Sequence, residues 1–164
     1  MSAFPRKSDL MIRKATPDDI GAIDALLYQV HKIHADLRPD LFRNGAKKYT
    51  DDELIGILQD ETRPIFLKIE EGKVEGYAFC ILTEVKNDLS LCDRKTLYID
   101  DLCVDASCRG KGVGRALFRY VRDFASAAGC TNLTLNVWAG NEGARCFYEA
   151  MGMKTMKTEM EILL

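Results

Sequence analysis

Residues 109–114, with the sequence RGKGVG, have the residue types and spacing that suit the binding of a phosphate. Three of the six residues are glycines, and glycine lets a backbone turn sharply and approach a ligand closely. Arg109 and Lys111 add two cations, and apolar residues at helical spacing begin at Val113. Because a loop and a helix start both offer unpaired N–H groups, this stretch predicts a site for a phosphorylated ligand.

The spacing of the glycines excludes two common phosphate-binding motifs. A P-loop needs GxxxxGK followed by Ser or Thr, but Asp105 stands at the first glycine position and Gly112 follows Lys111. A dinucleotide fingerprint needs GxGxxG, and Gly114 comes one position too early for it. The remaining pattern is Arg-x-x-Gly-x-Gly, from Arg109 to Gly114, which by itself also fits a glycine-rich surface turn.

The sequence predicts the elements that must position this loop. Residues 97–104 form a short run rich in branched apolar side chains, which is typical of a buried strand. From Val113 to Ala128 apolar residues recur at helical spacing, and Gly129 follows where a helix C-terminus favours glycine. The loop is therefore expected between a strand and a helix.

A second strand and helix follow in the distal half of the chain. Residues 131–138 alternate in polarity, which predicts a strand, and the next apolar residues, including Phe147 and Tyr148, share one helical face that ends before Gly152. With the Arg-x-x-Gly-x-Gly loop in front of it, this order resembles the GNAT superfamily of acyl-CoA N-acyltransferases. The resemblance covers residues 11–163.

The resemblance implies acetyl-CoA as co-substrate, because in that family this loop holds the pyrophosphate of coenzyme A. In that family the strand before the loop separates from its parallel neighbour, and its free backbone groups pair with the pantetheine arm of the cofactor. A backbone N–H near Leu102 would then polarise the thioester carbonyl. Asn141 matches a family residue that touches the same arm, although it also suits a helix N-cap. By motif position the cofactor-binding residues are Leu102, Cys103, Val104, Arg109, Gly110, Lys111, Gly112, Val113, Gly114 and Asn141.

The resemblance also implies two catalytic residues, Tyr148 and Asp100. Tyr148 would give a proton to the departing thiolate, the alternative being a core tyrosine packed beside Phe147. Asp100 stands where many members carry a Glu, so it is the candidate base. A carboxylate near pKa ~3.9 facing an ammonium near ~10.4 leaves about 9 kcal/mol to overcome, which favours a water chain ending at Asp100 or a purely electrostatic role. Asp101, a candidate substrate contact, is expected on the other face of the sheet.

The acceptor is expected to be an amine. Asp36 and Phe42 lie in the connection between the first two helices, which lines the acceptor pocket in the family. The alternative for Phe42 is an apolar side chain that packs into the core. An acidic mouth of Asp100 with Asp36, Asp40 and Glu84 would favour a cationic acceptor. The resemblance therefore implies acetyl transfer to a primary amine, with a small amine or polyamine favoured. A peptide N-terminal or lysine acetyltransferase and a non-catalytic acyl-CoA-binding module are the alternatives.

The whole chain predicts one mixed α/β domain over residues 11–164 after a tail at 1–10. Its central sheet should be mostly antiparallel, with helices on both faces and strands 97–104 and 131–138 running parallel. Further strands are expected at 11–15, 64–70, 74–85 and 153–164, and helices after Thr16 and over 50–59. Glu71-Gly72-Lys73 indicates a hairpin, and Gly76 within the following strand indicates a bulge or a close approach.

Composition and charge limit the classes of partner that the protein is expected to bind. A net charge of −2 over 164 residues gives no basic field for nucleic acid, and no apolar run approaches the ~20 residues of a membrane span. The six cysteines show no CxxC spacing and His31 and His34 lack a third ligand nearby, so no metal is expected. Free thiols indicate a cytoplasmic protein. The predicted strand 153–164 could serve as a pairing edge in a homodimer.

Overall fold

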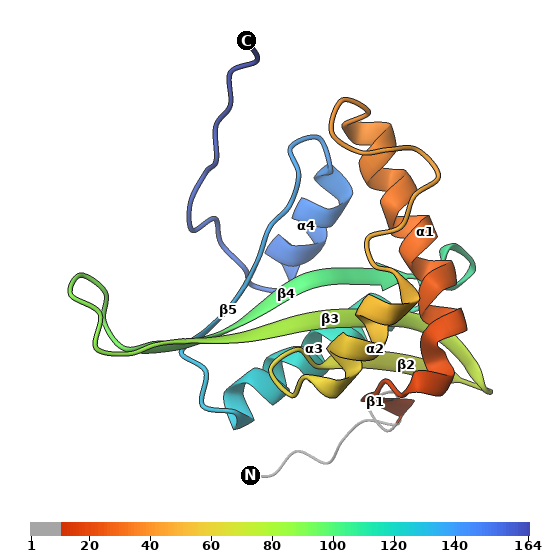
Figure 1. Cartoon of the computed structure of the whole chain (residues 1–164), viewed down its shortest axis with the longest axis horizontal. Helices are drawn as coiled ribbons and strands as arrows, with labels where there is room; N and C mark the ends of the chain where they lie inside the picture. The colour runs from red at the N-terminus through yellow and green to blue at the C-terminus, as the bar shows by residue number, and fades with distance from the viewer. Residues whose placement is uncertain (1–10) are drawn as a thin grey trace.

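Within residues 11–164, which are those that the computed structural model describes, five strands form one sheet (Figure 1). The strands span Ile12–Lys14 (β1), Ile65–Glu70 (β2), Lys73–Val85 (β3), Arg94–Val104 (β4) and Asn132–Leu135 (β5). β1 to β4 pair antiparallel in sequence order, and β5 adds to β4 in parallel. The predicted mostly antiparallel sheet is confirmed, and the predicted tail at 1–10 lies outside the described residues.

Helices cover both faces of the sheet, as predicted (Figure 1). α1 (Ile20–Leu37) and α2 (Asp51–Gln59) lie on one face, α3 (Val113–Ala127) lies on the other, and α4 (Glu142–Ala150) follows β5. α2 begins at a capping box, in which the Glu53 N–H donates to the Thr50 hydroxyl and the Glu53 carboxylate accepts from the Thr50 N–H. Short 3-10 turns precede α1 (Pro17–Asp19) and α3 (Ala106–Cys108).

Each face of the sheet has its own apolar core. The α3 face buries Leu97, Ile99, Val113, Leu117, Phe118 and Val121, and α4 contributes Phe147 and Tyr148 at its margin. The α1–α2 face buries Ile23, Leu27, Leu54, Leu67, Tyr77 and Phe79. Both faces of the sheet are therefore covered by packed side chains.

The hairpin between β2 and β3 follows the predicted turn. Glu71 and Gly72 both have positive φ (47° and 79°), the combination that a two-residue type I′ turn requires. The β2–β3 register then skips one residue, because Ile69 pairs with Val74 while Lys68 pairs with Gly76. The bulge expected near Gly76 is confirmed, with Glu75 as the extra residue.

Three expectations about element bounds are wrong or need adjustment. Residues 153–164 form no strand; they leave α4 as an extended arm that runs away from the sheet (Figure 1). Alternating polarity predicts a strand only where a neighbour completes the hydrogen-bond ladder, and no strand within residues 11–164 pairs with the arm. β5 is shorter than 131–138, and α1 continues to Leu37, so Asp36 lies on a helix rather than in a loop.

Candidate active site

A β-bulge in β4 brings two carboxylates to the same face of the sheet. Ile99 pairs with Cys80 and Asp101 with Phe79, so Asp100 is the extra residue. Before the bulge Ile99 faces the α3 core, and after it Cys103 faces the α1–α2 core. The expectation that Asp100 and Asp101 point to opposite faces is therefore wrong, because an extra residue shifts the alternation by one.

Asp101 is buried, with only 9% of the residue exposed. Its Oδ2 accepts a hydrogen bond from the Tyr77 hydroxyl at 2.8 Å, and Tyr77 is itself fully buried on β3. Burial raises the pKa of Asp101 to about 6, although the Tyr77 hydrogen bond acts in the opposite direction. Such a carboxyl changes its protonation near the pH at which many enzymes operate.

Asp100 has a different environment. Its Oδ2 accepts a hydrogen bond from the Tyr49 hydroxyl at 2.5 Å and forms an ion pair with the Lys48 Nζ at 2.9 Å. The Tyr49 ring stacks on Phe79 at 5.6 Å, which fixes Tyr49 against the α1–α2 face. No local pattern in the sequence marks Lys48 and Tyr49 as site residues, because Tyr49 and Asp100 are 51 residues apart in the chain.

The two central parallel strands part beside this bulge. The β4–β5 ladder ends at the pair Ile99 and Leu135, whereas β4 continues to Val104. Among the described residues no strand pairs with residues 100–104 on their β5 side, which leaves backbone groups for an extended ligand. Leu102 and Val104 are half-buried there, while the buried Cys103 thiol lies 3.6 Å from the Leu26 carbonyl oxygen on the opposite face.

The glycine loop has the backbone that a phosphate site needs. Gly110 and Gly112 have positive φ (75° and 84°), and α3 begins directly after Gly112. The first helical bond joins the Ala116 N–H to the Gly112 carbonyl, so the N–H groups of residues 113–115 lie ahead of the helical ladder. Arg109 and Lys111 are both exposed beside them. These residues fit the diphosphate of a nucleotide thioester.

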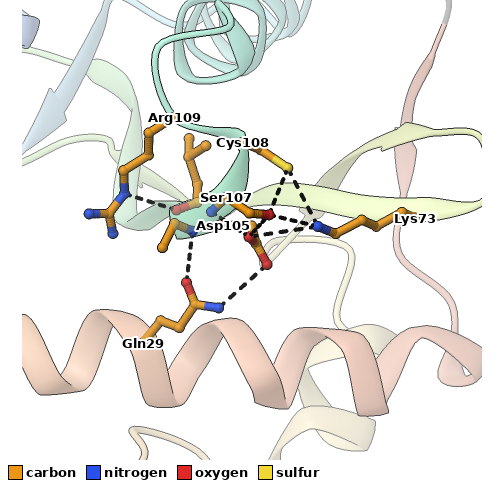
Figure 2. Close-up of polar contacts among 8 residues, drawn as sticks. Gln29, Lys73, Asp105, Ser107, Cys108 and Arg109 are labelled. Carbon is orange, nitrogen blue, oxygen red and sulfur yellow. Dashed lines mark hydrogen bonds and ion pairs between the residues drawn. The ribbon is translucent and has the colours of Figure 1, made fainter.

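Side chains from α1 and β3 hold the start of this loop in place (Figure 2). The Gln29 amide accepts from the Ala106 N–H at 3.0 Å and donates to the Asp105 carboxylate at 3.4 Å. Asp105 also accepts from the Ser107 N–H at 2.8 Å, and the Lys73 Nζ donates to the Ser107 hydroxyl at 2.9 Å. The strand end and the loop thus keep one relative position.

Tyr148 reaches the site from α4. Its ring packs against Phe118 and Phe147, with centroids 6.0 and 5.1 Å away, and it is half-buried. Burial raises the pKa of Tyr148 above its usual value, and the charge of Asp101 raises it further. Asn141 caps α4 by accepting from the Ala144 N–H at 3.2 Å. Its predicted contact with the pantetheine arm stays a prediction.

The residues predicted to contact the acceptor amine have separate partners and form no single cluster. Phe42 packs between Trp138, His31 and His34, with ring centroids 5.4–5.8 Å apart. Asp36 is exposed and pairs with Lys32 at 2.8 Å. The other carboxylates of the expected acidic mouth also have their own cations, in the pairs Asp40–Arg38, Glu84–Lys86 and Asp100–Lys48. The structure therefore does not gather a set of unpaired acidic groups.

Two surface cavities lie away from the loop. The larger, about 440 Å³, is lined by Ser90–Arg94 and Thr131 and contains none of the predicted site residues. The smaller, about 200 Å³, is lined in part by Tyr49 and Arg63. Across residues 11–164 no cluster of potential metal ligands is found, all six cysteines are free, and no helix has the length and apolar character to cross a membrane.

Comparison with known proteins decides the family. The family model described as "Acetyltransferase (GNAT) family" matches residues 27–153, which is most of the chain. The chain belongs to the acetyltransferase (GNAT) family. Members of this family use acetyl-CoA as the acetyl donor, so the protein is an N-acetyltransferase by family, as predicted.

Individual relatives agree with this assignment. A mutant of the BH1408 protein from Bacillus halodurans has the same fold, with a TM-score of 0.89 and 32% identity over 93% of this chain and 98% of that one. The glucosamine 6-phosphate N-acetyltransferase of Arabidopsis thaliana is 27% identical over 70% of this chain and 67% of its own. The aminoglycoside N-acetyltransferase AAC(6')-Iy, solved with CoA, shares the fold at a TM-score of 0.68 and 17% identity, over 93% and 98% of the two chains.

Proposed function

We propose that the protein transfers an acetyl group from acetyl-CoA to a primary amine, by direct attack of the amine in a ternary complex. The observation that supports this most is the parting of β4 from β5 after Ile99, immediately before the glycine loop. An extended thioester can lie along residues 100–104 while its diphosphate meets residues 109–114. Tyr148 and the two carboxylates of the bulge then flank the place where the thioester ends.

Several of the predicted residues have a defined role in this proposal. The N–H groups of residues 113–115, with Arg109 and Lys111, hold the diphosphate. The backbone of Leu102 and Val104 pairs with the pantetheine amides, and a backbone N–H near Leu102 polarises the carbonyl. The Tyr148 hydroxyl gives its proton to the departing thiolate, for which a phenol is a suitable donor.

A small amine is the acceptor class that we favour. Relatives support it in their names, since one acts on glucosamine 6-phosphate and another on aminoglycosides. Because Asp36, Asp40, Glu84 and Asp100 each pair with a cation, we do not rest the proposal on a strongly acidic mouth.

The experiment is an acceptor screen. The full-length protein is incubated with acetyl-CoA and a panel of amines, and free thiol is followed with a chromogenic disulfide. The panel contains an amino sugar phosphate, an aminoglycoside, diamines, polyamines and a peptide with a free N-terminus. Thiol release with one of the small amines is expected. Binding of acetyl-CoA without thiol release for any amine would instead indicate an acyl-CoA-binding module, and release with the peptide alone a peptide acetyltransferase.

We also propose that the protein is a cytoplasmic homodimer that uses the arm of residues 153–164. Met156, Met160 and Ile162 on this arm are exposed to 69%, 89% and 83%. β5 is the last strand of the sheet, and its outer edge is unpaired within the described chain. An arm from a second copy that adds to this edge would supply the missing ladder and cover apolar side chains. The free thiols support a reducing compartment.

A further inference from the structure

The connection between α1 and α2 spans the gap that opens where β4 and β5 part. At one end, Lys48 and Tyr49 contact Asp100 on β4, at 2.9 and 2.5 Å. At the other end, the Phe42 ring packs edge-on against Trp138, which follows β5, with the ring centroids 5.4 Å apart. The C-terminal end of α1 therefore lies beside the connection from β5 to α4 (Figure 1). An acceptor at the end of the proposed thioester would have the α1–α2 connection as its neighbour.

This connection carries an excess of positive charge. Residues 31–48 contain five lysines and arginines but only two aspartates. The carboxylates that were expected to make the mouth acidic are each paired with a cation. Such a surface favours an acceptor that carries a negative charge in addition to its amine.

Arg38, at the C-terminal end of α1, is the cation of this connection with the most defined geometry. Its Nε and Nη2 donate to the two oxygens of Asp40, at 2.8 and 2.6 Å, and this pair fixes the plane of the guanidinium. The guanidinium carbon lies 6.0 Å from the centre of the Trp138 ring. The backbone is held as well, because the Arg38 carbonyl accepts from the N–H groups of Leu41 and Phe42, both at 3.0 Å. The remaining edge of the guanidinium, at Nη1, is directed away from Asp40 towards a further partner.

The Nη1 edge holds a carboxylate from a distant part of the chain. Glu161, on the arm of residues 153–164, forms an ion pair with the Arg38 Nη1 at 2.6 Å. The Arg38 side chain is 22% exposed and that of Glu161 is 55% exposed, and within residues 11–164 no strand pairs with the arm. Glu161 is thus the partner that can leave, because an exposed ion pair contributes little free energy. Its position marks a place that accepts a carboxylate or a phosphate.

We infer that Arg38 binds an anionic group of the acceptor, a carboxylate or a phosphate, at the edge that Glu161 occupies in the free protein. The inference rests on the acetyl transfer proposed above and names the chemistry of the acceptor, which is a small amine that also carries an acid group. This acid group replaces Glu161 on Nη1, while the amine extends towards the bulge of β4. A diamine or a polyamine has no group for this edge.

Two classes of small amine supply such an acid group. An amino acid has a carboxylate and an amino sugar phosphate has a phosphate, and either matches the paired donors of a planar guanidinium. An amine with no acid group would instead meet the like charges of residues 31–48 without compensation. The acid group therefore decides which amines bind well.

The test compares pairs of amines that differ only in the acid group. One pair is glucosamine 6-phosphate and glucosamine, and the other is the free amino acid lysine and 1,5-diaminopentane. For each amine kcat/KM is measured with acetyl-CoA as thiol release by the full-length protein. We expect the wild-type protein to prefer the acid-bearing member of at least one pair by about tenfold. The pair that shows the preference distinguishes a phosphate from a carboxylate.

Two variants test the residues at this edge. Arg38→Met removes the charge and keeps an unbranched side chain beside Trp138. It should lower kcat/KM about tenfold for the acid-bearing amine, mainly by raising KM, and leave that for the other member within about twofold. Glu161→Gln removes the competing carboxylate, so it should lower KM for the acid-bearing amine about threefold with kcat unchanged.

Matched variants serve as controls. Arg145 also pairs with two carboxylates, Glu142 and Glu149, but on the exposed surface of α4, so Arg145→Met should keep the wild-type preference. Glu159→Gln changes an exposed carboxylate two residues before Glu161 on the arm and should leave KM unchanged. Thermal melting and acetyl-CoA titration establish that each variant is folded.

The outcomes separate the inference from the proposed function. Turnover that is equal within both pairs, or confined to amines without an acid group, overturns the inference and leaves acetyl transfer to an amine standing. A preference that survives in folded Arg38→Met has the same consequence. If Arg38→Met is not folded, Glu161→Gln decides, and an unchanged KM overturns the inference. No thiol release from the wild-type protein with any amine overturns the proposed function and the inference with it.

Discussion

A methyl group on Gly76 would lie 2.7 Å from the carbonyl oxygen of Cys103 on the neighbouring strand. The contact is with backbone in the centre of the sheet, next to the strand end that precedes the glycine loop, so it cannot be relieved by a side-chain rotation. We expect Gly76→Ala to lower the free energy of unfolding by about 2 kcal/mol or more. Urea denaturation measures this.

Gly21→Ala is the matched control for Gly76. A methyl group at this exposed position in α1 meets no atom within 4 Å. Alanine is favoured over glycine in a helix, so this variant should be equally stable or more stable, by up to about 1 kcal/mol. Equal destabilisation by both substitutions would show that the close approach of β3 and β4 is not what requires Gly76.

Tyr148→Phe tests the proton donor. The ring keeps its contacts with Phe118 and Phe147, and only the hydroxyl is lost. We expect turnover to fall tenfold or more while the affinity for acetyl-CoA stays nearly the same. Steady-state thiol release and isothermal titration measure the two quantities. Unchanged turnover would remove Tyr148 from the mechanism and leave it a core residue.

Arg109→Ala tests the diphosphate site. Arg109 is exposed beside the N–H groups at the start of α3, where its charge can meet a phosphate. We expect the dissociation constant of acetyl-CoA to rise about tenfold, a loss of ~1.4 kcal/mol, with the difference shrinking at high salt. Arg122 lies further along α3 and is paired with Asp123, so Arg122→Ala should bind acetyl-CoA as the wild type does. If both variants bind equally, the loop does not hold the diphosphate.

Asp19 gives a pH dependence of stability. The Arg13 guanidinium donates two hydrogen bonds to it, at 2.8 and 2.9 Å, and these lower the pKa of Asp19 to about 2. The carboxylate therefore stabilises the fold above its unfolded pKa of ~3.9, and this contribution disappears as the pH falls towards 2. We expect Asp19→Asn to cost about 1–2 kcal/mol at pH 7 and much less near pH 2.

The neighbouring Asp18→Asn is the control for that experiment, since Asp18 is exposed in the same turn. It should have little effect on urea denaturation at either pH. A cost for Asp19→Asn that stays constant down to pH 2 would contradict the ionic origin of the stabilisation.

The arm of residues 153–164 gives a prediction about assembly. Met160→Glu with Ile162→Glu places charges on its exposed apolar face, which should halve the mass measured by light scattering and leave acetyl-CoA binding intact. Lys157→Gln, on the alternate face of the extended arm, should remain a dimer. A wild-type protein that is monomeric at tens of micromolar would refute the proposed exchange of arms.

Several features of the protein could be predicted from local sequence alone. Residues 109–114, the cap at Thr50 and the turn at Gly72 each act through the backbone within a few residues, so their types and spacing suffice. The family follows from the same short patterns in their order along the chain. Residues 102–104 and 109–114, which are expected at the cofactor site, lie at the end of β4 and the start of α3, whereas Asn141 caps α4.

The tertiary structure decided what depends on contacts between distant segments. One extra residue in β4 turned Asp101 to the same face as Asp100, and no alternation of polarity in the sequence marks that bulge. Tyr49, Lys48 and Tyr77 reach these carboxylates across gaps of 24 to 52 residues, as the numbering shows. The arm at 153–164 has the pattern of a strand but pairs with no strand among residues 11–164, because strand formation requires a neighbouring backbone as well as a suitable sequence.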